Sequence, residues 1–256
     1  MKLGQITSYI DVAQVAIWTF WLFFIGLIIY IRREDRREGY PLFSEPSNTY
    51  KSGDLFFVPS PKTFHLPHGG TATAPNGKVD GRDHRAAKIE SWPGAPLAPI
   101  GDPMLAAVGP GSYAERSNTV DLTVEGAPKI VPLRVATTFY LEGRDPDPRG
   151  YTVIGGDGEV GGKISDVWVD RSEVLIRYLE VAVAGGAKTV LLPINFATID
   201  GGRARVLVDA IFGRHFANVP ALANPTQVTL LEEDKIVGYY GGGTLYANAS
   251  RQEPLL

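Results

Sequence analysis

The sequence contains no cysteine, and this absence removes several kinds of chemistry at once. Disulfides, thiolate nucleophiles and cysteine-ligated zinc or iron–sulfur sites are excluded, which agrees with a reducing compartment. A strong excess of charge is also missing: the formal net charge is −3, so composition gives no sign of nucleic-acid binding. The G-x-S-x-G, H-E-x-x-H and P-loop motifs are absent as well. We therefore find no machinery of a stand-alone enzyme.

The most informative stretch of the chain is one that lacks charge, residues 12–31. At about 1.5 Å per residue, a helix of this length spans roughly 30 Å, the thickness of the hydrocarbon core of a bilayer. A cleaved signal peptide is one alternative, but it has a shorter apolar region, a basic start and a small-residue cleavage site. A buried core helix is the other alternative. We predict a transmembrane α-helix over residues 12–31.

The arginines that follow the apolar stretch indicate its orientation. Lys2 is the only basic residue before the stretch, and four arginines come soon after it. Basic residues favour the cytoplasmic side, so residues 1–11 are predicted to be periplasmic and the C-terminal bulk cytoplasmic. The end of the helix is interpreted as a solvated, snorkelling end, as a site for anionic lipid headgroups, or as both. The residues predicted at the membrane interface are Tyr30, Arg32, Arg33, Arg36, Arg37 and Tyr40.

Proline dominates the next part of the chain. Fifteen of the 19 prolines lie between Pro41 and Pro148, where no long helical periodicity is visible. Proline removes a backbone donor and fixes φ, so this part favours extended chain and turns. Its apolar residues, such as Phe56 and Phe64, need burial, and a partner protein or the membrane interface is the expected surface. We predict an extended membrane-surface segment over residues 32–105 and a cytoplasmic globular domain over residues 106–256.

From Tyr151 onward the pattern is that of short strands. Four stretches, "KISDVWVD", "VLIRYLEVAVA", "TVLLPINFATI" and "ARVLVDAIF", are rich in β-branched and aromatic residues and are separated by turns. This spacing predicts a small antiparallel barrel with its core at about residues 145–240. The stretch "TLLEEDKIVGYYGGGTLY" predicts a short C-terminal helix that ends near Gly238, followed by a glycine-rich tail. The predicted fold class is a single N-terminal transmembrane helix with a cytoplasmic mainly-β domain and a short C-terminal helix.

Two short motifs allow a binding function, but their surroundings favour a structural one. The G-x-G-x-x-G at residues 156–161 is a dinucleotide signal only before a helix, and the strand-like segment that follows it favours a hairpin turn instead. His65 and His68 form an H-x-x-H pair, but Pro67 rules out an ordinary helix between them. We therefore predict no metal site there.

Several longer motifs, taken in order, resemble one protein family. "RREDRREGYPL" after the apolar stretch, "PKTFHLPHGG", "DPRG", "DVWVDRSE" and "LLEEDKIVGYYGGGTLYA" are similar to the H subunit of the photosynthetic reaction centre of purple bacteria, over nearly the whole chain. The resemblance implies a single-pass protein of the bacterial inner (intracytoplasmic or chromatophore) membrane, with a β domain of the PRC-barrel type. It implies a non-catalytic subunit that caps the cytoplasmic face of the pigment- and quinone-bearing subunits, stabilises the complex and supports proton uptake to the secondary quinone.

The resemblance also implies partners and cofactors. The expected partners are the reaction-centre L and M subunits and membrane lipids, with a cytochrome subunit and a light-harvesting 1 ring as further candidates. The complex is expected to contain bacteriochlorophyll, bacteriopheophytin, quinones, non-haem iron and a carotenoid, none of them ligated directly by this chain. The alternative function is a membrane-tethered PRC-barrel adaptor that binds a different partner. A membrane-anchored enzyme is the third option, and it requires a pocket with convergent polar groups.

The resemblance implies proton-transfer residues in and after the "DVWVDRSE" stretch. Asp170 and Glu173 match family positions beneath the secondary quinone site, and Arg177 is a cationic neighbour. Buried carboxylates with shifted pKa values can relay protons near neutral pH. The alternative interpretation is that these residues are ordinary acids of an exposed hairpin turn and an ordinary strand arginine.

Further proton-transfer candidates carry less support. Asp166 is included because strand alternation puts it on the same face as Asp170. Some family members have histidines just before the "KIVP" segment at the proton entrance, and this sequence has none there. Asp121 and Glu125 are the expected acceptors in their place. His215 lies elsewhere in the sequence and is not assigned to the pathway.

Overall fold

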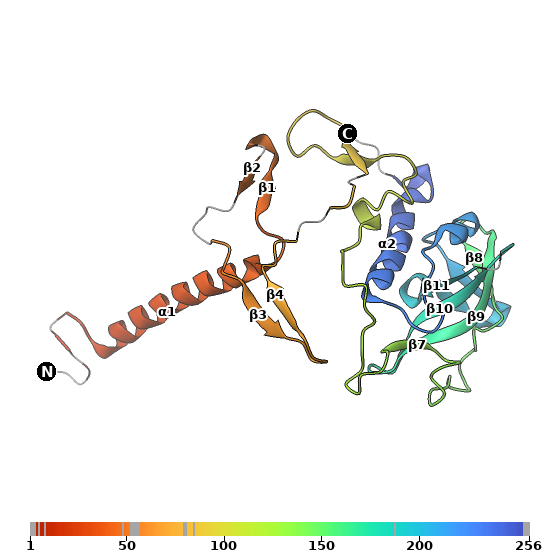
Figure 1. Ribbon diagram of the computed structural model, residues 1–256, viewed down its shortest axis with the longest axis horizontal. Helices are drawn as coiled ribbons and strands as arrows, with labels where there is room; N and C mark the ends of the chain where they lie inside the picture. Colours follow the sequence, from red (N-terminus) through yellow and green to blue (C-terminus); the bar gives the residue numbers. More distant parts are fainter. Residues whose placement is uncertain are drawn as a thin grey trace. The chain divides into compact units, whose positions relative to one another are not determined.

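The computed structural model describes residues 4, 6–7, 9–47, 49–51, 57–78, 81–83, 85–186 and 188–252. The chain forms two compact units, Met1–Gly81 and Arg82–Leu256 (Figure 1). Lys2 and Phe56, which enter the predictions above, lie outside the described residues.

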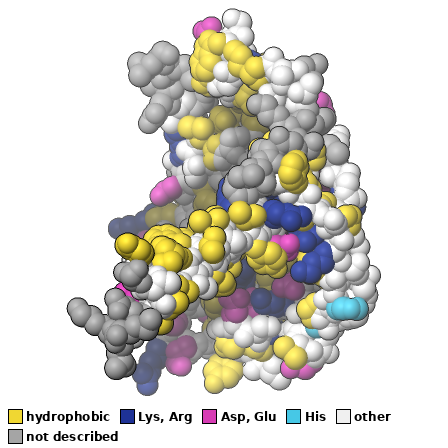
Figure 2. Space-filling model, turned by 90° about the vertical axis from the view of Figure 1, so that its left-hand side faces the viewer, with side chains coloured by type: hydrophobic (Ala, Val, Ile, Leu, Met, Phe, Trp, Pro, Cys, Tyr) yellow, Lys and Arg dark blue, Asp and Glu magenta, His cyan; other side chains and the backbone are white. Residues whose placement is uncertain are grey.

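The first unit contains one long apolar helix, α1 (Val12–Glu34). Asp11 begins it with a capping box: the Asp11 carboxylate accepts from the Gln14 N–H at 2.8 Å, and the Gln14 side chain accepts from the Asp11 N–H at 3.2 Å. Its 23 residues reach about 34 Å at the usual rise per residue. The apolar side chains of α1 are exposed within the chain (Figure 2). The mean hydropathy of an 18-residue window of this helix is 2.2. The predicted helix, long and apolar enough to span a membrane, is confirmed.

Arg37 connects the end of this helical region to the chain that follows. It lies in a single 3₁₀ turn, η1 (Asp35–Arg37), and its guanidinium makes two 2.8 Å bonds to the Glu34 carboxylate. The same guanidinium donates to the carbonyl oxygens of Ser60 at 2.8 Å and Ala74 at 3.0 Å. The strands that the structure describes in this proline-rich region are short, as expected because proline has no backbone N–H to donate. They pair as β1 (Leu42–Ser44) with β2 (Thr49–Lys51), and β3 (Lys62–His65) with β4 (Thr71–Ala74).

The second unit is a mainly-β domain (Figure 1). Its main sheet has the order β11-β10-β9-β8-β13-β12, and β7 also pairs with β9. The pairs are antiparallel except β8 with β13, so the predicted mainly-β domain with antiparallel strands is confirmed, with one parallel pair in addition. The strands are β7 (Ile130–Pro132), β8 (Thr152–Gly155), β9 (Val160–Asp170), β10 (Leu175–Val183), β11 (Thr189–Pro193), β12 (Thr198–Asp200) and β13 (Arg205–Val208), with β5 (Ala86–Lys88) and β6 (Leu97–Pro99) in a separate hairpin.

The core of the second unit lies between this sheet and helix α2 (Leu230–Tyr246). Trp168 of β9, Leu179 of β10 and Tyr240 of α2 have no exposed surface. The pairing of β9 with β10 contains two register shifts, which increase the local twist and help the sheet to curl. Short 3₁₀ helices are η2 (Glu45–Ser47) in the first unit, and η3 (Gly109–Gly111), η4 (Ile194–Phe196), η5 (Gly201–Arg203), η6 (Gly213–Asn218) and η7 (Ala249–Arg251) in the second.

The C-terminal helix α2 is longer than the sequence predicted. Thr229 begins it with a capping box, and the helix then continues through the glycine run to Tyr246, so the predicted end near Gly238 was wrong. These glycines permit a close approach of two backbones: a Cβ at Gly241 would lie 2.6 Å from the carbonyl oxygen of Pro110. Tertiary packing therefore outweighs the poor helix propensity of glycine.

The G-x-G-x-x-G stretch forms the hairpin between β8 and β9, and the prediction of a turn is confirmed. Gly158 has φ +81°, a conformation that favours glycine. Gly161 lies against the ring of Phe216, where a Cβ would come within 2.3 Å of a ring carbon. A strand follows these glycines rather than the helix that a dinucleotide site requires.

Candidate functional site

A lysine and three carboxylates gather in the second unit, and we call them the Lys129 cluster. Lys129 Nζ lies 3.3 Å from Glu173 Oε1, 3.5 Å from Asp170 Oδ2 and 3.8 Å from Asp121 Oδ2. Lys129 directly precedes β7, Asp170 ends β9, and the pairing of these two strands brings them together. The structure thus places three of the predicted proton-transfer residues around a cation that sequence reasoning did not select.

Exposure falls steeply within the Lys129 cluster. The side chains of Glu173 and Asp121 are 50% and 47% exposed, that of Lys129 is 20% exposed, and that of Asp170 is fully buried. Asp170 Oδ1 accepts hydrogen bonds from the backbone N–H groups of Ser172 at 2.9 Å and Glu173 at 3.0 Å. Among the described residues, Asp170 Oδ2 has no hydrogen-bond partner, and it faces the Lys129 ammonium. A buried carboxylate oxygen left in this state is costly and marks a candidate functional group.

Lys129 keeps its positive charge in this environment. Burial acts to lower the pKa of its ammonium, but the hydrogen bond to Glu173 and the charges of Asp170, Glu173 and Asp121 outweigh burial and raise the pKa above its ordinary value. Glu125 lies exposed on the turn that follows Asp121, and hydrogen bonds from Thr123 and from its own backbone lower the pKa of its carboxyl. The cluster therefore holds acidic groups at several depths around one fixed cation.

Two family models match the chain. A model of the photosynthetic reaction centre H-chain N-terminal region matches residues 4–135, which is more than half of the 256 residues. The chain belongs to the photosynthetic reaction centre H-chain family. A model of the PRC-barrel domain matches residues 142–215 of the H chain, a range that contains β8 to β13. Two members of the Lys129 cluster, Asp170 and Glu173, lie in this PRC-barrel range, and the other two lie in the N-terminal range.

Membership in this family makes the H chain a subunit of a light-driven electron-transfer complex. It associates with the rest of the reaction centre, the L and M subunits, in a complex that contains pigments and quinones. Together with the apolar helix α1, this describes a membrane-anchored single-pass protein. The cytochrome subunit, the light-harvesting 1 ring and the type of membrane stay predictions.

The histidine pair does not form part of a metal site in the described chain. His65 ends β3 and His68 lies in the turn that follows, both with exposed side chains. Within the described ranges, no group of three or more histidine, cysteine or acidic side chains is arranged to hold a metal ion.

Arg177 lies on β10, away from the contacts that define the Lys129 cluster. Its charge acts on a hydrogen-bonded pair in which the Tyr178 hydroxyl donates to Glu233 at 2.7 Å. Burial raises the pKa of Glu233, although the hydrogen bond from Tyr178 and the charges of Arg177 and Arg116 act in the opposite direction. Lys129 therefore takes the place predicted for Arg177 beside the carboxylates. The Tyr178–Glu233 pair joins residues 55 positions apart, and no local pattern indicated it.

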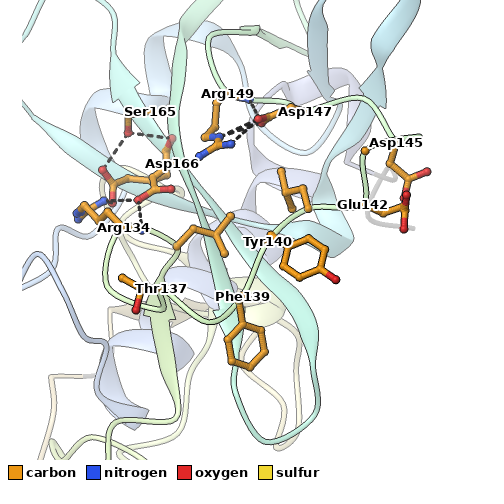
Figure 3. A pocket seen from close by; sticks show the side chains of 14 residues that line it. Arg134, Thr137, Phe139, Tyr140, Glu142, Asp145, Asp147, Arg149, Ser165 and Asp166 are labelled. Carbon is orange, nitrogen blue, oxygen red and sulfur yellow. Dashed lines mark hydrogen bonds and ion pairs between the residues drawn. The ribbon is translucent and has the colours of Figure 1, made fainter.

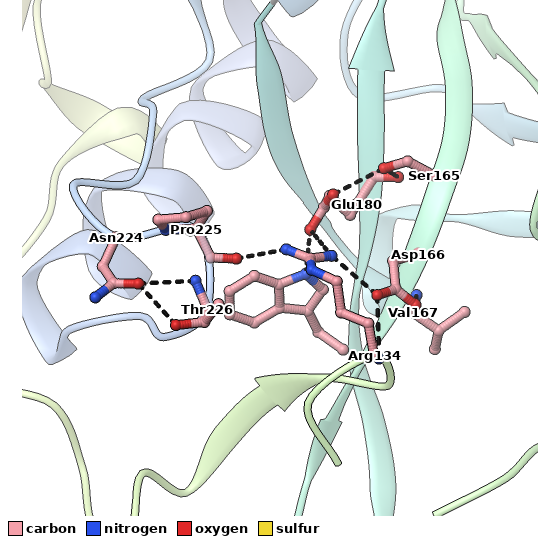
Figure 4. A network of polar contacts seen from close by, with 9 residues as sticks. Arg134, Ser165, Asp166, Val167, Glu180, Asn224, Pro225 and Thr226 are labelled. Carbon is pink, nitrogen blue, oxygen red and sulfur yellow. Dashed lines mark hydrogen bonds and ion pairs between the residues drawn. The ribbon is translucent and has the colours of Figure 1, made fainter. Parts of the chain in front are cut away.

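Asp166 belongs to a different polar network, which we call the Arg134 network (Figure 4). Arg134 Nη1 donates to Asp166 Oδ2 at 2.9 Å and to Glu180 Oε2 at 2.8 Å. The indole N–H of Trp168 also donates to Glu180 Oε2 at 2.9 Å, and Arg134 Nη2 donates to the carbonyl oxygen of Pro225. The network joins β9 and β10 to the chain segment that precedes α2.

The Arg134 network forms part of the wall of an open groove of about 960 Å³ (Figure 3). The loop that follows β7 contributes Phe139, Tyr140 and Glu142, and the exposed ion pair of Asp147 with Arg149 lies beside them. The Arg149 guanidinium holds the pKa of Asp147 below its ordinary value. The buried carboxylates of the groove are those of Asp166 and Glu180, and both of their oxygens have hydrogen-bond partners. Neither carboxylate therefore has an unpaired oxygen like Asp170 Oδ2.

Asp166 and Asp170 do not form one site. Both are buried, but they are four residues apart on β9, about 13 Å at the rise of a strand. Asp166 pairs with Arg134 and Asp170 with Lys129. The assignment of Asp166 to proton transfer stays a prediction, and its contacts here are those of a structural ion pair.

The predicted membrane-interface residues differ in how far the protein itself engages them. Arg32 pairs with Asp35 at 3.1 Å, with both side chains about half exposed. The Arg36 guanidinium lies 5.0 Å from the centre of the Tyr40 ring. Arg37 is largely buried by the contacts described above. The exposed residues of the predicted set are Tyr30, Arg32 and Arg33, and the binding of lipid headgroups at this end of the helix stays a prediction.

His215, which the sequence did not assign to the pathway, makes a contact with the residue that precedes its 3₁₀ helix. Its Nδ1 accepts a hydrogen bond from the Phe212 N–H at 3.2 Å, and its ring stacks on the Phe212 ring. Burial lowers the pKa of the imidazole from 6.5, and the charge of Arg214 acts in the same direction. The stability that this group contributes is therefore present above pH 6.5 and is lost as the pH falls through the lower pKa of the folded state.

The substitution His215→Asn tests whether His215 destabilises the folded chain as the pH falls. Asparagine can accept the same hydrogen bond through Oδ1 but does not titrate, so we expect a smaller fall in the free energy of unfolding between about pH 7 and pH 5. Urea denaturation of the full-length chain in detergent, at both pH values, measures the free energy of unfolding. Equal pH dependence in the two proteins would show that His215 does not contribute.

Proposed function

We propose that the H chain caps the cytoplasmic face of the quinone-bearing subunits and that the Lys129 cluster passes protons towards the secondary quinone. The observation that carries the proposal is the fully buried Asp170 carboxylate, whose Oδ2 faces Lys129 without a hydrogen-bond partner among the described residues. When bound in the partner subunits, the quinone supplies the electron acceptor that takes up protons.

The contrast between the exposed acids of the cluster and the buried Asp170 supports a direction of proton movement. Glu125 and Asp121 lie at the surface, where ionised carboxylates can capture protons from water. Glu173 is half exposed and shares Lys129 with both Asp121 and Asp170. The proposed route therefore runs from the exposed acids Asp121, Glu125 and Glu173 to the buried Asp170.

Asp170 Oδ2 is the proposed acceptor of a transferred proton, because it has no hydrogen-bond partner among the described residues. Its other carboxylate oxygen is occupied by two backbone N–H groups, which hold the side chain in one orientation. Lys129 offsets part of the negative charge but has no lone pair while its ammonium stays protonated, so it orients the acids rather than carrying the proton.

The cap also has an electrostatic effect. Covering the quinone sites removes bulk water from their surroundings, and a lower effective dielectric strengthens the interactions of nearby charges. The basic residues after α1 support a cytoplasmic position for the second unit, because positive residues favour that side of the membrane.

The substitution Glu173→Gln tests the proposed route. We expect the proton-coupled second electron transfer to the secondary quinone to become about tenfold slower, because a carboxamide cannot accept the proton. The initial charge separation should keep its rate. Flash spectroscopy of the whole complex measures both steps.

Glu115→Gln is a matched control, since Glu115 is an exposed glutamate of the second unit outside the cluster. It should leave both rates unchanged. A second electron transfer in Glu173→Gln as fast as in the control would contradict the route.

A further inference from the structure

Strands β3 and β4 of the first unit form a hairpin with two unlike faces. Residues that pair directly across a hairpin lie on the same face, and successive residues alternate between the faces. The register places Phe64, Ala72 and Ala74 on one face, with Lys62 at its open end, and Thr63, His65, Thr71 and Thr73 on the other. Phe64 is 39% exposed, and Leu66, just after β3, is 47% exposed. The hairpin therefore has one polar face and one apolar face with exposed side chains.

Arg37 and Lys62 hold this hairpin against the end of α1, and it extends from there to one side of the helix (Figure 1). The Arg37 guanidinium, which pairs with Glu34, also donates to backbone carbonyl oxygens at the open end of the hairpin. Lys62 Nζ lies 3.8 Å from Glu34 Oε2, in the last turn of α1, and 5.5 Å from the centre of the Phe64 ring. Because one lysine side chain lies near both groups, the face that carries Phe64 is turned towards the end of α1.

The end of α1 places the hairpin at the depth of the lipid headgroups. The charge-free stretch ends at Ile31, and about 20 helical residues already span the roughly 30 Å hydrocarbon core. Glu34 lies one turn further, about 4.5 Å along the helix, whereas the headgroup layer is about 5–7 Å thick on each side. The open end of the hairpin, where Lys62 pairs with Glu34, therefore lies in this layer.

We propose that the apolar face of the β3–β4 hairpin rests on the lipid bilayer beside α1, with Phe64 and Leu66 among the headgroups and upper acyl chains. Burial of these side chains stabilises a two-stranded hairpin, which is marginal on its own. The polar face meets water. The backbone stays out of the hydrocarbon core, because unpaired N–H and C=O groups at the strand edges are costly there.

The attachment of the hairpin to α1 favours the membrane over a partner protein, the two surfaces that the sequence left open for this segment. The arginines Arg32 and Arg33 are exposed at the same end of α1, and they add attraction for anionic lipids. This contact belongs to the first unit, so it does not depend on the proton route through the Lys129 cluster.

The absence of cysteine allows a direct test of depth, because one introduced cysteine carries the only spin label of the chain. Ala72→Cys places the label on the apolar face, and Thr73→Cys, one residue along β4, places it on the polar face; both residues are exposed. Each labelled full-length chain is combined with the remaining reaction-centre subunits in vesicles of phosphatidylcholine and phosphatidylglycerol. Electron paramagnetic resonance then measures collisions of the label with oxygen, which concentrates in the bilayer, and with a water-soluble nickel chelate.

The ratio of oxygen collisions to nickel collisions should be about tenfold higher for Ala72→Cys than for Thr73→Cys, because the bilayer concentrates apolar molecules and excludes polar ones. Equal ratios would place both faces in the same medium and overturn the proposal. A label in Ala72→Cys that collides with neither reagent would show that protein covers the apolar face, which also overturns it.

The substitution Phe64→Ser tests whether the aromatic side chain seats the hairpin. Added to Ala72→Cys, it should lower the collision ratio by at least about threefold, because most of the buried apolar area is lost. Thr63→Ser, on the polar face, is the matched control and should leave the ratio unchanged. A ratio in Phe64→Ser equal to that in Thr63→Ser would contradict the proposal.

Discussion

Replacing Asp170 by asparagine is expected to slow the proton-coupled second electron transfer to the secondary quinone by about 100-fold, within the range that a positioned proton carrier contributes. The effect should exceed that of Glu173→Gln, because Asp170 is fully buried whereas Glu173 is half exposed and water can bypass it. The initial charge separation should not change. Flash spectroscopy of the complex with each variant H chain provides the rates.

Asparagine is the informative replacement at this position. Its Oδ1 can still accept from the N–H groups of Ser172 and Glu173, so the turn keeps its geometry while the group loses its ability to bind a proton. Asp157→Asn is a matched control, because Asp157 Oδ1 also accepts from two backbone N–H groups, those of Glu159 and Gly213, in a different turn. Equal slowing by both substitutions would mean that the effect is structural.

The second large effect is expected on stability, from Arg134→Met. Removing this guanidinium leaves Asp166 and Glu180 buried without their cation, and breaking a buried pair in this way typically costs about 3–5 kcal/mol. The contact with the carbonyl oxygen of Pro225 is lost too, which releases the segment before α2. We expect the free energy of unfolding, from urea denaturation of the full-length chain, to fall by about 3 kcal/mol, the lower end of that range, since the arginine itself is 41% exposed.

Arg149→Met provides the comparison for this loss. Arg149 pairs with Asp147, and both side chains are nearly half exposed, so the substitution should cost less than about 1 kcal/mol. If the free energy of unfolding fell by similar amounts in the two variants, the Arg134 network would not be a major source of the stability of the domain. Electron-transfer rates in assembled Arg134→Met complexes should stay near wild type if the network is structural.

Much of the fold could be predicted from the sequence, because the signals are local. The charge-free stretch predicted α1, which in fact continues to Glu34 because the following arginines and acids are good helix formers. β-branched runs and glycine turns predicted the strands. The end of α2 was predicted wrongly because the low helix propensity of glycine was taken to end the helix. In the folded chain, Gly241 packs closely against the backbone of Pro110, a contact that no local sequence pattern reveals.

The candidate site was predicted in part. Asp170, Glu173 and Asp121 were selected from the resemblance and from their position before the "KIVP" segment, and they lie together. Lys129 was missed because its role depends on the pairing of β7 with β9, which no local pattern encodes. Arg134 was missed for the same reason: its partner Glu180 is 46 residues away in the chain.

Proton transfer through the Lys129 cluster is tested most directly by the rate of proton uptake after the second flash, followed with a pH-indicator dye in whole complexes that carry wild-type or Asp170→Asn H chain. Proton uptake and the second electron transfer should slow by the same factor in the variant, about 100-fold. Proton uptake at the wild-type rate in Asp170→Asn would contradict the claim that protons pass through the Lys129 cluster.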